Sequence, residues 1–240
     1  MPTDLHNPAN EPDKMLALVQ SASLTRLLAE AVEKMILSGE IKPGGKLNEM
    51  AIAERFGVSR GPLREAFRML EESGLVRQEK NRGAFVREVD IGEAAAIYEV
   101  RAGLDATAGR LLAGKITPAQ IERLRQYGDD MQRAAQENDV DAFHRLNLAF
   151  HDQVVAMTEN ACLIDVYRRL VKQLVLFRRR NLLAPRAIPN FADEHSAIVD
   201  SLARGDGSLA ADLLYRHAEG GRQRMLQIHA EDHAGHEDAA

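Results

Sequence analysis

The chain has a single cysteine, no long apolar run and no overall positive charge. Because Cys162 has no second cysteine to pair with, an intramolecular disulfide is excluded, which is typical of a reducing cytoplasm. No charged-then-apolar leader begins the chain, and no apolar run approaches the roughly 20 residues that a membrane span needs. We therefore expect a cytoplasmic protein with no membrane partner. The formal net charge of −5 means that any affinity for nucleic acid must come from a local basic cluster.

Length and composition indicate two domains with less ordered ends. A chain of 240 residues is long enough for two hydrophobic cores. Residues 1–20 contain prolines among polar side chains, which is typical of a flexible arm, and residues 231–240 are expected to form a disordered tail. Since the hydrophobic pattern becomes wholly helical near residue 90, we expect a first domain over 21–88 and a second over 89–230.

The segment from residue 59 to 70 predicts a helix with two different faces. Ser59 can cap it, and Pro62 falls in the first turn, where its missing N–H costs little. The apolar positions recur at helical spacing: Leu63, Phe67 and Leu70. Arginines repeat every four residues on the neighbouring face: Arg60, Arg64 and Arg68. A helix with one buried face and a column of arginines is suited to a DNA major groove, although an amphipathic surface helix with solvated charges would share this pattern.

The surrounding segments complete a winged helix-turn-helix. A short helix capped by Asn48 precedes the arginine helix, and Ser73-Gly74 ends that helix with glycine at the expected position. Residues 75–79 and 84–87 then read as two strands joined by a turn whose tip is basic. Between Arg55 and Arg87 there are eight basic and four acidic residues, so this region supplies the local positive charge that the whole chain lacks.

These motifs together resemble the DNA-binding domain of GntR-type transcriptional regulators. The likeness covers about residues 24–88 and includes Pro43-Gly44, Leu47-Asn48-Glu49, Val58-Ser59-Arg60-Gly61-Pro62-Leu63-Arg64-Glu65-Ala66 and Gly74-Leu75-Val76. In that family the positions matching Arg60, Gly61, Arg64 and the wing tip contact operator DNA. With the cap and the rest of the arginine column, the predicted DNA-binding residues are Ser59, Arg60, Gly61, Arg64, Arg68, Lys80, Arg82 and Gly83.

The second domain is predicted to be an antiparallel bundle of about six helices. The expected helices span residues 91–113, 118–137, 139–158, 160–182, 190–204 and 206–229, with short connections between them. Ligand sites in bundles form inside, from side chains on facing helices. In the first of these helices the predicted inner face contains Ile97, Leu104, Ala108 and Leu111, with Arg101 among them.

Polar residues on the inner faces predict a metal site. They are Arg101, Asn147, His151, His195 and His217. Neutral imidazoles that converge from separate helices are good ligands for zinc or a similar transition ion, and a buried guanidinium needs a partner anion. Asn147 and His151 can close on one centre because they are four residues apart.

Two alternatives remain open at this point. The spacing alone also allows Asn147 to act with His144, which lies one turn earlier on the same helix. The histidines could instead be ordinary core residues that are hydrogen-bonded to backbone carbonyls.

The second domain resembles the FCD ligand-binding domain, which marks the FadR-like branch of the GntR regulators. The likeness spans about residues 92–228 and rests on residues 141–151, Thr158-Glu159-Asn160, Glu194-His195 and Gly205-Asp206 through His217. Many such domains bind a divalent metal through an Asp-x-x-x-His pair and two later histidines. Asn147, His151, His195 and His217 occupy those positions, so asparagine stands where the family has aspartate. The resemblance also implies a small carboxylate effector, a sugar acid or organic acid, held by the metal and by Arg101.

The sequence therefore predicts a mainly α protein with an N-terminal winged helix-turn-helix and a C-terminal antiparallel all-helical bundle of the FCD type. The expected function is that of a homodimeric repressor, not an enzyme, which binds a short palindromic operator in double-stranded DNA and is controlled by its effector. Zinc is the expected metal, with nickel and manganese as alternatives. One rival is a metal-dependent phosphohydrolase of the HD type, suggested by His151-Asp152. The other is an architectural DNA-binding dimer without a small ligand.

Overall fold

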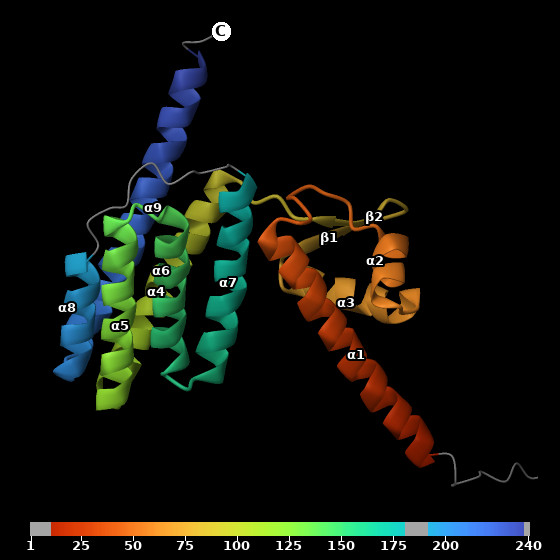
Figure 1. Cartoon of the computed structure of the whole chain (residues 1–240), viewed down its shortest axis with the longest axis horizontal. Helices are drawn as coiled ribbons and strands as arrows, with labels where there is room; N and C mark the ends of the chain where they lie inside the picture. The colour runs from red at the N-terminus through yellow and green to blue at the C-terminus, as the bar shows by residue number, and fades with distance from the viewer. Residues whose placement is uncertain (1–10, 181–191, 238–240) are drawn as a thin grey trace, which may run out of the picture. The chain divides into compact units, whose positions relative to one another are not determined.

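The computed structural model describes residues 11–180 and 192–237, with side chains over 22–178 and 193–231. The chain divides into two compact units between Glu88 and Val89, where the sequence analysis also placed the end of the first domain. Each unit has its own core and is described by itself. The elements of both are labelled in Figure 1.

The first unit is a winged helix-turn-helix. Its elements are α1 (Glu11–Ser38), α2 (Glu49–Phe56), α3 (Arg60–Glu72), β1 (Val76–Glu79) and β2 (Gly83–Val86) (Figure 1). The two strands form an antiparallel hairpin in which Val76 pairs with Val86 and Glu79 pairs with Gly83. The segment before α2 lies along the other edge of β2, since the amide of Leu47 donates to the carbonyl of Ala84. The predicted helices and wing are confirmed.

The local signals around α2 and α3 have different strengths. The Asn48 side chain caps α2 by accepting a hydrogen bond from the amide of Ala51 at 3.2 Å. Gly57 ends α2 with a φ of 63°, a conformation that glycine adopts without the steric cost of a Cβ. Ser59 occupies the cap position of α3, but its side chain makes no capping hydrogen bond. The start of α3 is therefore held by packing, and the capping expected of Ser59 is corrected.

The apolar stripe of α3 holds the first unit together. Leu63, Phe67 and Leu70 are buried against α1, whose Val32 and Ile36 are fully buried. Burial of large aliphatic and aromatic side chains is the main favourable contribution to folding. The arginine column lies on the remaining, exposed face of α3.

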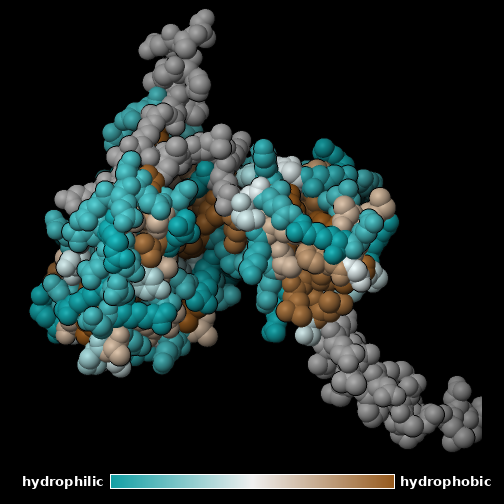
Figure 2. All heavy atoms as spheres, in the orientation of Figure 1, coloured by the Kyte–Doolittle hydropathy of each residue, from teal (hydrophilic) through white to brown (hydrophobic). Residues whose placement is uncertain are grey.

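The second unit is an all-helical bundle. It contains α4 (Ile91–Ala113), α5 (Pro118–Gln136), α6 (Val140–Ala156), α7 (Ala161–Arg180), α8 (Ala192–Ala203) and α9 (Gly207–Glu237) (Figure 1). Each corresponds to one of the six predicted helices, because capping signals such as the Thr117–Gln120 capping box begin helices where the sequence places them. The visible surface of this unit is largely hydrophilic in Figure 2, and its apolar residues lie inside.

Helix is also present at both ends of the described chain. Helix α1 begins at Glu11, within the segment 1–20 that was expected to be a flexible arm, and α9 runs to Glu237, into the expected disordered tail 231–240. Pro12 does not prevent the first of these extensions, because proline is tolerated in the first turn of a helix. Residues 1–10 and 238–240 lie outside the described residues. None of the described helices is long and apolar enough to cross a membrane.

Helices α4 and α9 approach closely at Gly109. A Cβ at this position would lie 2.7 Å from Leu214 Cδ1 and 2.9 Å from the carbonyl carbon of Ala210. Real Cβ atoms do not come this near to a backbone atom, so the crossing requires glycine. Since α9 carries His217 and α4 carries Arg101, this crossing also sets the spacing of the site.

We expect Gly109→Ala to destabilise the protein by about 1–3 kcal/mol, the usual cost of overpacking a core. Gly128→Ala on α5 is the matched control, because no atom lies within 4 Å of its added Cβ. That change should be neutral or stabilising by up to about 1 kcal/mol through helix propensity. Urea unfolding of both variants measures the difference, and equal stability would contradict the close crossing.

Candidate functional site

The first unit has a groove between α3 and the wing, with a volume of about 890 Å³. Six of the eight predicted DNA-binding residues line it: Arg60, Arg64, Arg68, Lys80, Arg82 and Gly83. Ser59 and Gly61 are exposed at the start of α3 but do not line this groove. The fold therefore places the helix column and the wing tip on one surface.

Most arginines of this groove already have a carboxylate neighbour. Arg64 Nε lies 3.0 Å from Glu49 Oε1, and Arg68 pairs with Glu65 at 2.6 Å. Arg82 pairs with Glu79 on the wing. Exposed pairs of this kind contribute at most about 1 kcal/mol, so phosphate oxygens can replace the carboxylates at little cost. Among the described residues, Arg60 and Lys80 have no carboxylate within ion-pair distance.

The wing carries a second basic feature that the sequence analysis missed. The Phe85 ring on β2 is approached by three cations, at distances from the ring centroid of 5.2 Å for Arg77, 5.6 Å for Arg82 and 5.9 Å for Lys46. Lys46 forms an isolated β-bridge with Phe85 and lines the groove. Its place depends on chain pairing across the edge of β2, which the local pattern around Lys46 does not reveal.

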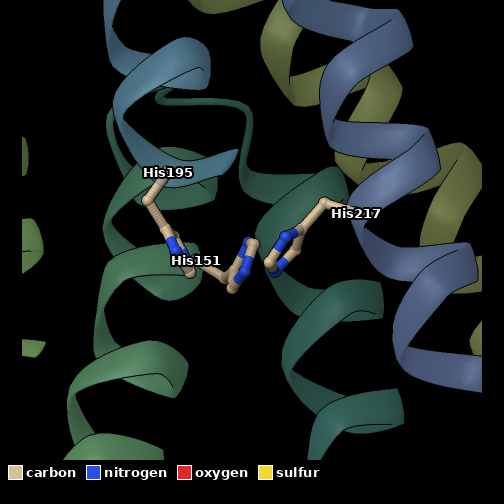
Figure 3. Close-up of side chains that lie close together, drawn as sticks. All are labelled: His151, His195 and His217. Atoms are coloured by element: carbon tan, nitrogen blue, oxygen red, sulfur yellow. The ribbon is translucent and has the colours of Figure 1, made fainter. Parts of the chain in front are cut away.

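Three histidines meet inside the second unit. His151 on α6, His195 on α8 and His217 on α9 point toward one another in Figure 3, and one ligand nitrogen from each lies within 4.8 Å of the others. All three are buried. The predicted convergence of the three histidines is therefore present, while Asn147 lies beside them as a partner of His195.

In His195 and His217, a hydrogen bond to one ring nitrogen determines which of the two nitrogens can bind a metal. His217 Nδ1 lies 2.6 Å from Glu194 Oε2, and His195 Nε2 lies 3.0 Å from Asn147 Oδ1. Because these oxygens can only accept, each ring donates its proton there and carries its lone pair on the other nitrogen, Nε2 of His217 and Nδ1 of His195. A carboxylate or carbonyl partner on the far nitrogen is the usual arrangement behind a metal-binding histidine.

The third ring, His151, is held in the neutral form by its surroundings. Burial lowers the pKa of His151 well below its usual value, and the neighbouring His217, Arg101 and His195 lower it further. Its two ring nitrogens have no hydrogen-bond partner among the described residues. A neutral imidazole with a nitrogen available is the form that binds zinc and related ions.

The structure distinguishes between the two histidines of α6. His144 lies outside the cluster, half-buried beside Arg178 and Asp141. Asp152, the second residue of the His-Asp dipeptide, forms a two-pronged ion pair with Arg168 at 2.7 and 2.8 Å, so it faces away from the histidines. The dipeptide therefore does not act as one unit.

Arg101 is buried, as its inner-face position predicts, but it already has an anion. Its Nε lies 3.1 Å from Oδ2 of Asp105, which is fully buried. The Tyr98 and Tyr167 ring centroids each lie 5.7 Å from the guanidinium carbon. Burial raises the pKa of the Asp105 carboxyl group, while Arg101 opposes this shift.

Asp105 was not predicted to face the interior, because the buried face of α4 is rotated slightly from the predicted one. Leu111, expected inside, is 42% exposed, whereas Ile97, Arg101 and Ala108 are buried as expected. The buried face also includes Tyr98, Asp105 and Leu112. The signal was present in the four-residue spacing of Arg101 and Asp105, which allows an ion pair along one helix. Asp105 is therefore an inward-facing residue that the predicted inner face of this helix did not include.

The donor set fits a divalent transition ion. Three buried imidazoles come from three helices, and two of them are oriented by oxygen partners on their other nitrogen. Soft or borderline ions such as zinc prefer this set of nitrogen donors over the oxygen-rich sites of magnesium and calcium.

Comparison with known proteins identifies the family. The description "Bacterial regulatory proteins, gntR family" matches residues 24–86, and the FCD domain matches residues 96–220. The chain belongs to the GntR family and carries an FCD domain. Members of the GntR family are transcriptional regulators that bind DNA and are not enzymes, so the phosphohydrolase alternative is wrong.

Two relatives support this assignment, and one solved structure shares the fold. The GntR protein described here is 32% identical to the "Probable D-xylose utilization operon transcriptional repressor" of Paenarthrobacter nicotinovorans, over 76% of this chain and 80% of that protein. It is 30% identical to the "Nta operon transcriptional regulator" of Aminobacter aminovorans, over 81% of this chain and 90% of that protein. The structure of Escherichia coli McbR/YncC shares the fold, with a TM-score of 0.72, 19% identity, and coverage of 86% of this chain and 98% of that chain.

The stability of this GntR protein should depend on the protonation of His144. Burial, with Arg178 beside it, lowers the pKa of His144 to about 4 from the usual 6.5, so the unfolded chain takes up a proton before the folded protein does. The free energy of unfolding should therefore fall as the pH drops from 6.5 toward 4. The free energy of unfolding of the His144→Gln variant should fall less over this pH range, because glutamine does not take up the proton. Urea titrations in the presence of a chelator measure this, and parallel pH profiles would contradict the assigned burial.

Proposed function

We propose that this chain is a homodimeric repressor that binds a short palindromic operator. A small carboxylate metabolite, bound in a metal-containing FCD domain, lowers its affinity for this operator. One observation carries the proposal: three buried histidines form a metal-ligand set in the same chain as a basic winged helix. The repressor role is supported by the similarity to the "Probable D-xylose utilization operon transcriptional repressor" of Paenarthrobacter nicotinovorans.

The DNA-binding half of the proposal uses the groove of the first unit. Helix α3 enters the major groove, where Arg60 and Arg64 contact bases or phosphates and Arg68 lies further along the same face. Lys80, Arg82 and Gly83 bring the wing to the backbone or the minor groove, while Ser59 and Gly61 lie at the exposed start of α3. Two copies then read two half-sites that are related by the two-fold axis of the dimer.

The dimer has a suitable surface on α4. Val100 and Leu111 are 55% and 42% exposed, although both are large aliphatic residues. They are eleven residues apart, which is about three helical turns and places them on one face. An exposed apolar face of this kind on a bundle is a natural contact for a second copy.

The sensing half of the proposal uses the histidine cluster. His151, His195 and His217 hold the ion, with Asn147 behind His195. A bound divalent ion, zinc first and nickel or manganese as alternatives, supplies a Lewis acid for a carboxylate oxygen of the effector. Arg101, which lies close enough to lower the pKa of His151, compensates the charge of that carboxylate. His195 and His217 lie on separate helices, so binding of the ion and effector shifts α8 relative to α9. This shift changes the separation of the two DNA-binding domains in the dimer, and the affinity for DNA falls.

Replacing Arg64 with alanine should weaken operator binding by about 1–3 kcal/mol, because a side chain that faces the DNA is lost. Arg125→Ala in the second unit is a matched control, since Arg125 is also half-exposed and ion-paired, with Asp200 at 3.4 Å. Gel-shift titration with a duplex selected from a random library by the wild-type chain gives both affinities. Equal losses in the two variants would contradict the docking of α3.

Effector and operator should disfavour one another by the same factor, typically about 5- to 150-fold. Calorimetry of the zinc-loaded chain with a panel of sugar acids and organic acids, with and without operator duplex, measures this coupling. The expected result is at least one acid that binds more weakly when DNA is bound. DNA binding without any response to the panel would instead favour an architectural dimer.

A further inference from the structure

Asp105 is a fully buried carboxylate of which only one oxygen is paired. Oδ2 lies 3.1 Å from Arg101 Nε, one turn away on α4. Oδ1 is also buried and has no hydrogen-bond partner among the described residues. A buried oxygen left without a partner costs stability, so its position calls for a donor.

One polar group close to this oxygen belongs to the histidine cluster. Oδ1 lies 4.0 Å from Nδ1 of His151, whose own two nitrogens are buried and unpaired. A separation of 4.0 Å is too long for a hydrogen bond, but a shift of about 1 Å would make one. That single movement would give a partner to Oδ1 of Asp105 and to Nδ1 of His151.

The tautomer of His151 decides whether it can form a hydrogen bond with Asp105. A neutral imidazole that carries its proton on Nε2 directs the Nδ1 lone pair at the carboxylate, and two lone pairs do not attract. When an ion takes Nε2, the proton must reside on Nδ1, where it faces Oδ1 as a donor. Metal binding therefore converts an unpaired contact into a charge-assisted hydrogen bond.

We infer that Asp105 is the positioning carboxylate of His151: Arg101 holds it by Oδ2, and its Oδ1 accepts the Nδ1 proton of His151 when Nε2 binds the metal. The same chain shows this arrangement at His217, whose Nδ1 donates to Glu194 at 2.6 Å. Asp105 is not itself assigned as a ligand, since it lies outside the group of ligand atoms that are within 4.8 Å of one another.

Arg101 then supports the metal site by orienting Asp105, and this role does not depend on an effector. Arg101 orients Asp105, Asp105 orients His151, and His151 binds the ion, so a change at Arg101 reaches the metal through two intervening residues. The inference rests on the proposed metal centre. It adds an anionic group to a site where Asn147 stands in place of the family's aspartate.

The test measures zinc affinity of the full-length chain by competition with a chromophoric chelator. Asp105→Asn keeps the size of the side chain but removes its charge, and zinc affinity should fall by about 10- to 100-fold. Asp152→Asn is the matched control: it neutralises the residue next to His151 that pairs with Arg168 instead, and zinc affinity should stay at the wild-type value. Glu194→Gln should weaken zinc binding in the same way as Asp105→Asn, because it acts on His217.

The outcomes separate this inference from the proposed function. If the wild-type chain binds no zinc, the metal centre itself is wrong and the inference falls with it. If the wild type binds zinc and Asp105→Asn binds it equally well, only the role of Asp105 is overturned.

Nitrogen-15 NMR of histidine-labelled wild-type protein provides a readout that does not depend on the folding of a variant. After zinc loading, His151 should show a protonated Nδ1 in a strong hydrogen bond and an unprotonated Nε2. A ring with its proton on Nε2, or an Nδ1 proton that exchanges freely with water, would overturn the inference.

Discussion

The confinement of three imidazoles in one buried space is the constraint on which the helical unit depends. A buried histidine is stable only while it stays neutral and its nitrogens have partners. His195 and His217 meet this condition through Asn147 and Glu194, whereas neither ring nitrogen of His151 has a hydrogen-bond partner within the described part of the chain. A cation on one nitrogen of His151 and a proton on the other would supply the partners that this ring needs.

The crossing of α4 and α9 makes this confinement possible. Gly109 lets the two helices approach until Leu214 fills the space where a Cβ would stand. The close approach brings His217 on α9 toward Arg101 and Asp105 on α4, and a larger residue would separate the helices at the level of the site. Gly109 therefore affects both the packing of the two helices and the geometry of the site. Protein interiors are close-packed, so a displacement of one helix is passed on to the residues packed against it.

In the DNA-binding unit the positive charge is confined to one groove, and its arginines can exchange their carboxylate partners for phosphates. The net charge of the chain is negative, yet the groove between α3 and the wing gathers arginines whose carboxylate partners are exposed. Such weak pairs keep the long side chains on the correct surface without a large cost when phosphates replace the carboxylates. The groove can therefore exchange its carboxylate partners for DNA phosphates, while the surface around it carries charges of both signs.

The sequence by itself determined the helices, the wing, the arginine column and the inward position of the histidines, because helical periodicity and turn residues are local signals. Only the tertiary structure decided that Ser59 makes no cap bond, that Lys46 joins the wing and that Asp105 faces His151. Periodicity assigns a residue to a face, but it does not fix the rotation and height of one helix against another. Those two quantities follow from packing, and they alone place Asp105 opposite His151.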